Sequence, residues 1–426
     1  MRREPGQLFF LVTQGCKVNQ YESQAIREAW MAEGLLETHD PLLADLILIN
    51  SCAVTERAVL DLAKLVRSFT AHSPRPWIVV AGCAVEADRD RVLALPGVDE
   101  VVAQHAKAGL ADSARPNDLL ALRISDYNRA RAVLKVQDGC SHGCTYCIIP
   151  TTRGVSVSRE PDDVIAEARR LLGAGIREIS LCGINLRQYG RDLAPAQDFW
   201  DLLARVDRAL APDWKGRARL RLGSLEPADL NSKALETLAA CDLMCPHLHL
   251  SLQSGSPEIL RRMGRGHYNP EGVFGFLERL QDIWVAFGLG ADIIAGFPGE
   301  TEEHFRQTLD VVERLPLTYA HVFPYSERPG TPAATFAGSV PGHLRRERAK
   351  ILRQAAGRKH AAFLHDLLAR PVMDLVAEDN GTGLNEFYVE CMFPDDGAAH
   401  RRQLVRVHPV NVHGDRLLVR LAGEGS

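Results

Sequence analysis

The chain contains no hydrophobic run long enough to cross a membrane. Apolar residues make up 46% of its 426 residues, but they occur in short segments, whereas a membrane-spanning helix needs about 20 consecutive apolar residues. The first six residues are mostly polar, and the apolar run at residues 8–12 is shorter than the core of a secretory signal peptide. We therefore expect a cytoplasmic protein without membrane contact.

A strong net charge is also missing. The 50 lysines and arginines nearly balance the 54 acidic residues, leaving a formal charge of −4. The chain as a whole therefore does not attract nucleic acid, and RNA binding would need a local basic patch. Repeats and low-complexity segments are absent too, which excludes a solenoid. The length instead predicts two or three globular domains.

Cysteine, by contrast, is plentiful, with ten residues. In a reducing cytoplasm, clustered cysteines indicate metal binding or catalysis rather than disulfides. Cys140, Cys144 and Cys147 follow the spacing C-x3-C-x2-C in one short loop. Structural zinc sites and cubane iron–sulfur clusters normally take four protein ligands. Three cysteines therefore favour a cluster with one open iron; the alternatives are zinc with His142 as fourth ligand, or buried inert thiols.

A second trio of cysteines has equivalent positions in three strand–helix units. Cys16, Cys52 and Cys83 each follow the end of an apolar segment, and sites in open α/β sheets form at the carboxyl ends of the strands. Three thiols at such positions could converge on a second cluster, whereas a single one would more often be an ordinary buried side chain. The remaining four cysteines are interpreted as structural: Cys182, Cys241, Cys245 and Cys391.

The hydrophobic pattern predicts an α/β chain with three domains. Short apolar runs at residues 8–13, 45–50 and 77–81 predict an N-terminal parallel sheet at 5–115. Six further runs predict a partial (β/α)6 barrel at 126–356, with strands at 132–136, 178–181, 220–222, 247–252, 290–294 and 320–323. Pro161 marks the start of one of its helices. Alternating segments at 387–393, 404–407 and 417–421 predict a small antiparallel β domain at 359–426.

The loop Cys140/Cys144/Cys147, with Tyr146 before its last cysteine, resembles the signature of the radical S-adenosylmethionine superfamily. Together with the strand-end trio and the C-terminal β domain, nearly the whole chain is similar to the methylthiotransferases, whose C-terminal domain is called TRAM. The segments 15–23, 245–255 and 321–332 resemble the branch that modifies threonylcarbamoyladenosine in tRNA. The other branches act on isopentenyladenosine in tRNA or on an aspartate of a ribosomal protein, and both stay open as alternatives.

The resemblance implies two 4Fe–4S clusters and S-adenosylmethionine as cofactors. It assigns Cys140, Cys144 and Cys147 to the radical cluster and Cys16, Cys52 and Cys83 to an auxiliary one. The positions that it implies for binding S-adenosylmethionine are Tyr146, Gly183, Asn185, Ser224, Glu226, Gln253 and Arg265. The acidic residue usual beside Gly183 is absent, and residues 265–268 depart from the family's pattern. Without the resemblance, Ser224 and Glu226 would be read as a turn with a helix cap.

A basic helix is predicted at residues 343–370, with eight lysines and arginines against two acids. Such a helix suits RNA phosphates, and the candidates for contact with the tRNA anticodon loop are Arg345, Arg346, Arg348 and Lys350. The alternative is a solvated helix between domains. Residues 371–426 are net negative, with five arginines and nine acids. The implied reductant is flavodoxin or ferredoxin; the remaining alternative function is a non-catalytic iron–sulfur sensor.

Overall fold

The computed structural model describes residues 3–112, 114–115, 117–394 and 400–423, and the chain forms two compact units. Unit 1 comprises Met1–Ser125, Lys135–Arg159 and Ser326–Ala334. Unit 2 comprises Asp126–Leu134, Glu160–Tyr325 and Thr335–Ser426. Unit 2 therefore combines most of the expected barrel with the small β domain, whereas residues 135–159, which include the Cys140 loop, belong to unit 1. The three domain ranges given above remain predictions.

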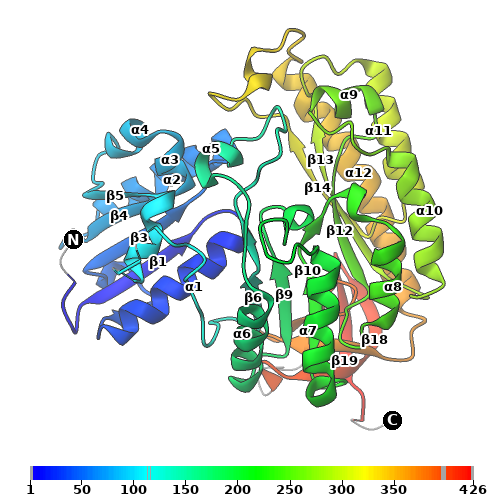
Figure 1. Ribbon diagram of the computed structural model, residues 1–426, viewed down its shortest axis with the longest axis horizontal. Helices are drawn as coiled ribbons and strands as arrows, with labels where there is room; N and C mark the ends of the chain where they lie inside the picture. The colour runs from blue at the N-terminus through cyan, green and yellow to red at the C-terminus, as the bar shows by residue number, and fades with distance from the viewer. Residues whose placement is uncertain (1–2, 113, 116, 395–399, 424–426) are drawn as a thin grey trace. The chain divides into compact units, whose positions relative to one another are not determined.

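Unit 1 contains a five-stranded sheet of order β2-β1-β3-β4-β5 in which all neighbours are parallel (Figure 1). Its strands are β1 (Leu8–Thr13), β2 (Leu36–Glu37), β3 (Leu46–Ser51), β4 (Trp77–Gly82) and β5 (Glu100–Ala103). The accompanying helices are α1 (Lys17–Ala32), η1 (Pro41–Leu43), α2 (Glu56–Thr70), α3 (Cys83–Ala87), α4 (Arg89–Leu93) and η2 (Gln104–Leu110). The three expected strands are present; β2 and β5 are additional.

Both faces of this sheet are covered, because successive residues of a strand point to opposite sides. On one face, Trp30 of α1 packs with Leu48 of β3. On the other, Leu62 of α2 packs with Ile49 of the same strand. Strands of a sheet that is covered on both faces are therefore expected to be apolar throughout, rather than to alternate apolar and polar residues. The same unit also holds a short antiparallel pair and a helix around the Cys140 loop: β7 (Gln137–Asp138), β8 (Val157–Ser158) and α5 (Ile149–Arg153).

The core strands of unit 2 form two sheets, of order β10-β9-β6 and β11-β12-β13-β14. Their bounds are β6 (Arg131–Lys135), β9 (Glu178–Cys182), β10 (Arg219–Leu222), β11 (Ser224–Leu225), β12 (His247–Gln253), β13 (Gly288–Ala295) and β14 (Tyr319–Pro324). All six expected core strands are present, and the pairs β9–β10, β11–β12, β12–β13 and β13–β14 are parallel.

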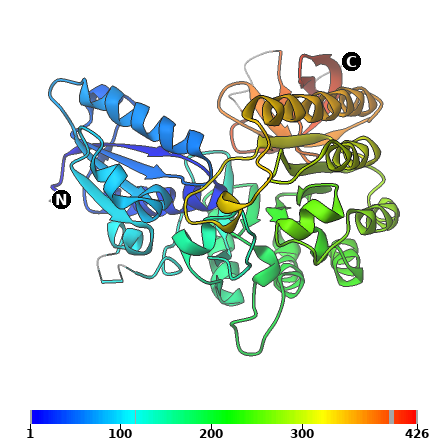
Figure 2. The ribbon, with the colours of Figure 1, turned by 90° about the horizontal axis from the view of Figure 1, so that it is seen from above.

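The helices of unit 2 run along the outer side of these strands (Figures 1 and 2). They are α6 (Pro161–Gly173), η3 (Leu186–Gln188), α7 (Phe199–Trp214), η4 (Pro227–Asp229), α8 (Ser232–Ala240), α9 (Pro257–Arg262), α10 (Pro270–Gln281), α11 (Glu302–Arg314) and α12 (Gly342–Leu367). The short helix η5 (Pro332–Thr335) belongs to unit 1 up to Ala334. Pro161 begins α6, as expected, and α12 is the predicted basic helix. Within the described residues, no helix combines the length and apolar character that crossing a membrane requires.

The small C-terminal domain is a closed barrel of order β15-β16-β17-β19-β18. Its strands are β15 (Met373–Ala377), β16 (Thr382–Asn385), β17 (Glu390–Met392), β18 (Leu404–His413) and β19 (Arg416–Leu421). The predicted small antiparallel β domain is confirmed, with one difference: four of the five neighbouring pairs are antiparallel, whereas β17 and β19 are parallel. The predicted strand at 387–393 is also shorter, because Tyr388 has a φ of 69° and forms a turn before β17.

Candidate active site

Cys16, Cys52 and Cys83 lie at the carboxyl ends of three neighbouring strands of unit 1. The first two loops approach closely: a Cβ added to Gly15, which has a φ of +87°, would lie 2.7 Å from the Cys52 sulfur. Burial raises the pKa of the Cys52 thiol to about 11, and the neighbouring Cys83 and Cys16 thiols act in the same direction. The structure thus brings together the trio that the strand-end pattern picked out.

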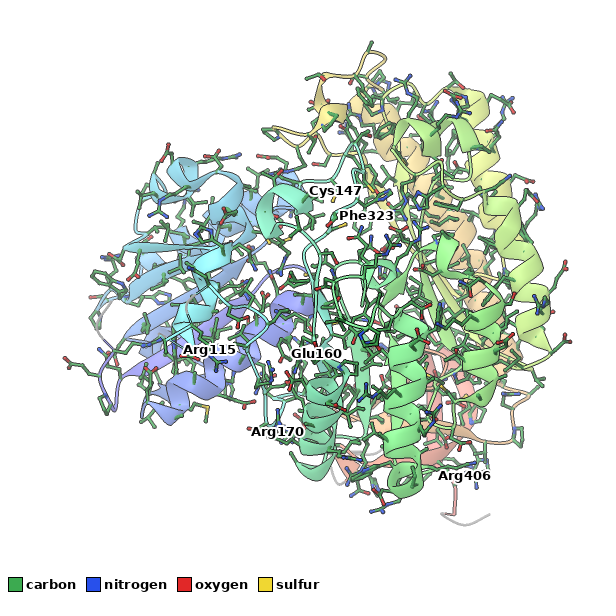
Figure 3. The ribbon with its side chains drawn as sticks, viewed as in Figure 1. Arg115, Cys147, Glu160, Arg170, Phe323 and Arg406 are labelled. Atoms are coloured by element: carbon green, nitrogen blue, oxygen red, sulfur yellow. The ribbon has the colours of Figure 1, made fainter. Side chains whose placement is uncertain are left out.

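The second trio lies in the loop between β7 and α5, where Figure 3 labels Cys147. The backbone N–H of Cys140 donates to Gly154 O at 2.9 Å, and that of Cys147 donates to Cys144 O at 3.1 Å. A Cβ on Gly139 (φ +67°) would lie only 1.9 Å from Val155 O, so only glycine fits this approach. All ten cysteines belong to the described part of the chain, and none is in a disulfide. Three thiols in a turn suit a cluster with one open iron.

An apolar contact joins the second loop to the first trio within unit 1. Ile148, which follows Cys147, packs with Cys83 and Ala53. The two sets of cysteines are therefore neighbours in the same compact unit, although the sequence separates them by a long interval. This contact was not part of the sequence prediction, because it joins segments with no common local pattern.

In unit 2, two of the expected cofactor residues, Asn185 and Arg265, meet at the carboxylate of a third, Glu226. Asn185 Nδ2 donates to Glu226 Oε1 at 3.1 Å, and Arg265 Nη2 lies 3.7 Å from the same oxygen. His267 Nε2 lies 2.9 Å from Glu226 Oε2, a contact that the sequence prediction missed because this segment departs from the usual pattern. Arg265 also donates to Ser251 O at 3.0 Å. This group is a polar cradle at the strand ends of the core.

The other expected cofactor residues occupy strand ends as well. Gly183 directly follows β9, the exposed Ser224 begins β11, and Gln253 ends β12 with a φ of 62°. Such a positive φ is uncommon for a residue with a side chain and marks a constrained turn. Tyr146 is half-buried in the Cys140 loop of unit 1. The role of each of these residues remains a prediction.

The four basic candidates on α12 differ in how far their side chains are exposed and in the hydrogen bonds that they already make. Arg348 is buried and donates to the carboxylate of Glu300 at 2.8 Å. Arg345 donates to Val340 O at 2.6 Å and to Tyr325 O at 3.1 Å. Both arginines therefore hold the loops around the start of α12, whereas Arg346 and Lys350 are exposed. The sequence could not separate the two kinds, because all four lie within one short basic run.

The inner face of the β12–β14 sheet carries a polar cluster that the sequence prediction missed. Asp292 Oδ1 of β13 lies 3.1 Å from His249 Nε2 of β12 and 3.2 Å from His321 Nδ1 of β14. Tyr319 OH lies 2.9 Å from His249 Nδ1. Burial opposes the charge of Asp292, but both histidines donate to it and lower the pKa of its carboxyl. We call His249, Asp292, Tyr319 and His321 the inner-face cluster.

The inner-face cluster lies opposite the apolar residues of the same strands. Leu248, Leu250 and Val322 are buried and alternate with the polar side chains, as strand geometry requires. Figure 3 labels Phe323, which follows the cluster near the end of β14. Two imidazoles and a carboxylate could also hold a divalent ion, but hydrogen bonds within the cluster already satisfy the atoms concerned.

Comparison with known proteins extends over both units. The model of the radical SAM superfamily matches residues 134–312, and that of "uncharacterized protein family UPF0004" matches residues 8–103. The threonylcarbamoyladenosine tRNA methylthiotransferase MtaB of Rickettsia prowazekii is 35% identical over 89% of this chain and 90% of its own length. The chain belongs to the radical SAM methylthiotransferase family.

Other relatives include both tRNA-modifying branches. MtaB of Bacillus subtilis is 34% identical over 79% of this chain and 77% of its own. A tRNA-2-methylthio-N6-dimethylallyladenosine synthase of Clostridium botulinum is 32% identical over 83% of each chain. Among solved structures, the radical SAM methyltransferase TsrM of Kitasatospora setae has a TM-score of 0.57 at 15% identity, covering 77% of each chain, which confirms the fold. Membership in this methylthiotransferase family implies an enzyme that uses a 4Fe–4S cluster and S-adenosylmethionine and transfers a sulfur-containing group.

Proposed function

We propose that this methylthiotransferase converts N6-threonylcarbamoyladenosine, next to the anticodon of tRNA, to its 2-methylthio derivative. The relatives from Rickettsia and Bacillus are named for this nucleoside, whereas the Clostridium relative is named for dimethylallyladenosine. Neither activity involves a ribosomal protein. The observation that carries the choice between the two nucleosides is the polar character of the inner-face cluster.

The two nucleosides differ in the group attached to N6. A threonylcarbamoyl group carries a carboxylate, a hydroxyl and an amide, whereas a dimethylallyl group is pure hydrocarbon. Covering His249, Asp292 and His321 with hydrocarbon would remove water from ionisable groups without replacing its hydrogen bonds. His321 is 54% exposed at its side chain, and its Nδ1 is held by Asp292. Because Nδ1–H donates to Asp292, the other ring nitrogen, Nε2, is an acceptor and can accept a hydrogen bond from the hydroxyl or an amide N–H of the substrate.

The residues of unit 1 supply the thiolates in this proposal. Cys140, Cys144 and Cys147 would hold the radical cluster, and the strand-end trio would hold an auxiliary cluster. When bound, the radical cluster and S-adenosylmethionine supply a carbon-centred radical. A radical suits the C2–H of adenine, because this hydrogen is too weakly acidic for a general base to remove. Gly139 and Gly15 allow the close backbone approaches on which both cysteine loops depend.

The residues of unit 2 would hold S-adenosylmethionine at the polar cradle. A carboxylate accepts hydrogen bonds from vicinal ribose hydroxyls, and Glu226 is the buried carboxylate at these strand ends. Asn185, Arg265 and His267 donate to it or lie beside it, so they hold its orientation. Gln253, Ser224 and Gly183 at the adjoining strand ends would contact the remaining polar groups of S-adenosylmethionine. Tyr146, which is part of the Cys140 loop of unit 1, would also bind this cofactor.

The tRNA would be bound through phosphates at Arg346 and Lys350, the exposed members of the basic run on α12. Because anticodon-loop bases are single-stranded, the target nucleoside can be splayed out of the stack. We further propose a cytoplasmic enzyme that receives electrons from a flavodoxin or ferredoxin.

The test is nucleoside mass spectrometry of tRNA carrying either N6-modified adenosine, after incubation with the anaerobically reconstituted enzyme. We expect the 2-methylthio product from the threonylcarbamoyl substrate. His321→Leu should lower kcat/KM for that tRNA by about fivefold, as expected for one lost hydrogen bond of about 1 kcal/mol. His105→Leu, at an exposed histidine of unit 1 paired with Glu86, is the matched control. Product from the dimethylallyl substrate alone would refute the assignment.

A further inference from the structure

Glu22 is a fully buried carboxylate surrounded by three cations in unit 1. Lys107 Nζ lies 2.5 Å from Glu22 Oε2, and Lys135 Nζ lies 3.3 Å from Oε1. Arg153 binds the same carboxylate with both terminal nitrogens, at 3.0 and 3.2 Å. Asp138 accepts from Arg153 at 2.8 Å and from Lys135 at 2.9 Å. We call these five residues the buried ionic network.

The buried ionic network reaches the segments that carry both cysteine trios. Glu22 and Asn19 lie on α1, whose N-cap is Cys16, and Arg153 Nη2 donates to Asn19 Oδ1 at 2.6 Å. Asp138 ends β7, just before Cys140, and Arg153 ends α5, just after the Cys147 loop.

Lys107 extends the network to the other two strand-end cysteines. Its ammonium donates to Asn50 Oδ1 at 3.0 Å and to Gln104 Oε1 at 2.8 Å. Asn50 lies near the end of β3, just before Cys52. Gln104 Oε1 also accepts a weak hydrogen bond from Cys83 Sγ at 3.8 Å. Every strand end of the first trio therefore has a connection to the network.

The charges of the network do not cancel. Its three cations exceed its two carboxylates by one positive charge, and all five side chains are at most 3% exposed. Burial opposes the charge of Arg153, but Glu22 and Asp138 raise the pKa of its guanidinium well above the usual value, and Cys83 and Cys16 lie close enough to add to the shift. A buried excess charge needs a counterion, and the neighbouring source of negative charge is the first trio, whose thiols become thiolates when they bind a metal.

We propose that Arg153 is a positioning residue that ties the loop of Cys140, Cys144 and Cys147 to the first trio and offsets the negative charge of a cluster held by Cys16, Cys52 and Cys83. This inference rests on the proposed function, because it assumes that both trios hold clusters. Arginine suits the task because its planar guanidinium can hold Glu22, Asp138 and Asn19 at the same time, which a lysine ammonium on a flexible chain cannot do with the same geometry.

The experiment uses the full chain, reconstituted anaerobically with iron and sulfide. The reduction potential of the strand-end cluster is measured by an EPR-monitored titration in a Cys144→Ala background, so that the other cluster does not contribute. Arg153→Gln should make this potential more negative, because removing a nearby positive charge disfavours the more negative reduced state. The double variant should hold as much iron as Cys144→Ala alone. Arg205→Gln, at an exposed ion pair with Asp162, is the matched control and should leave the potential unchanged.

A second readout uses the chain with both trios intact. Arg153→Gln should lower the methylthiolated product formed per S-adenosylmethionine cleaved by about tenfold, as is typical when a residue supporting a metal site is lost. Arg153→Lys should restore the reduction potential, because it keeps the charge. It should restore the amount of product formed per S-adenosylmethionine cleaved only in part. An unchanged potential and an unchanged product ratio in Arg153→Gln would overturn the proposal.

If Arg153→Gln fails to retain iron, the proposal is tested with Arg153→Lys instead. This variant should have the parental reduction potential but form less methylthiolated product per S-adenosylmethionine cleaved. A parental product ratio in Arg153→Lys would also overturn the proposal. These results can be separated from a failure of the proposed function. If the wild-type chain gave no product from threonylcarbamoyladenosine tRNA, the assigned substrate would be wrong, whereas the shift in potential would still test Arg153.

Discussion

Removing a single thiol should have a different effect on the reaction in each of the two cysteine trios. Cys144→Ala removes a ligand of the proposed radical cluster and should abolish cleavage of S-adenosylmethionine. Cys52→Ala removes a ligand of the other trio and should leave some cleavage but no methylthiolated product. Both quantities can be measured by chromatography of the same anaerobic reaction. Cys391→Ala, in the core of the C-terminal barrel, is the control for loss of a buried thiol.

Full product formation by Cys52→Ala would show that the strand-end trio has no part in the transfer. At this scale, the six cysteines could be predicted from the sequence because their signal is local: a fixed spacing in one case and equivalent strand ends in the other. The partners of Glu22 could not, because Arg153 lies 131 positions away in the sequence. Buried ion pairs of this kind carry no periodicity.

The helix α12 has basic residues of two kinds, and only one kind should affect RNA affinity. Arg346→Ala and Lys350→Ala should each weaken tRNA binding and reduce the slope of log K against log[salt] by about 0.7, the value for one phosphate contact with a single strand. Fluorescence anisotropy over a salt series measures both. Arg57→Ala, at an exposed arginine of α2, should leave the slope unchanged, and an unchanged slope in both α12 variants would place the RNA elsewhere.

Elements with a strong local pattern could be predicted, and short or closing strands could not. The six core strands and α12 follow from apolar runs and charge patterning. The strand β2 is two residues long, too short to stand out from the loops around it. The four-residue β5 lies at the edge of its sheet and, within the described residues, pairs only with β4. The parallel pair β17–β19 forms only when the C-terminal barrel closes, and closure depends on contacts between distant segments rather than on alternation within a strand.

Within unit 2, a buried ion-pair group attaches the C-terminal barrel to the core strands. Glu178 of β9 accepts from Arg219 Nε at 2.7 Å and from Arg221 Nε at 2.8 Å. These arginines also donate to backbone oxygens of the C-terminal barrel, Arg219 to Leu384 O at 2.7 Å and Arg221 to Asn385 O at 2.9 Å. The carboxylate therefore orients two guanidinium groups that cross from the core sheet to the barrel.

Glu178→Gln should loosen this attachment. Removing one member of a buried ionic group costs about 3–5 kcal/mol, so the variant should unfold at lower denaturant concentration and be cleaved faster by protease in residues 371–423. Asp242→Asn, at an exposed pair with Lys215, should cost at most about 1 kcal/mol. Wild-type rates of cleavage in the Glu178 variant would show that the barrel is held by its apolar contacts alone.

The same group sets a pH dependence for the attachment of the C-terminal barrel. Burial opposes the charge of Glu178, but Arg221 and Arg219 outweigh it and hold the pKa of its carboxyl well below the usual range. Because the folded-state pKa is lowered, this stabilisation is fully present above the ordinary glutamate pKa of about 4.3 and declines as the pH falls below it. Protease sensitivity of residues 371–423 should therefore rise on acidification in the wild type. The rise should be smaller in Glu178→Gln, which has no proton to gain at this position, and equal rises in the two chains would assign the acid sensitivity to other carboxylates.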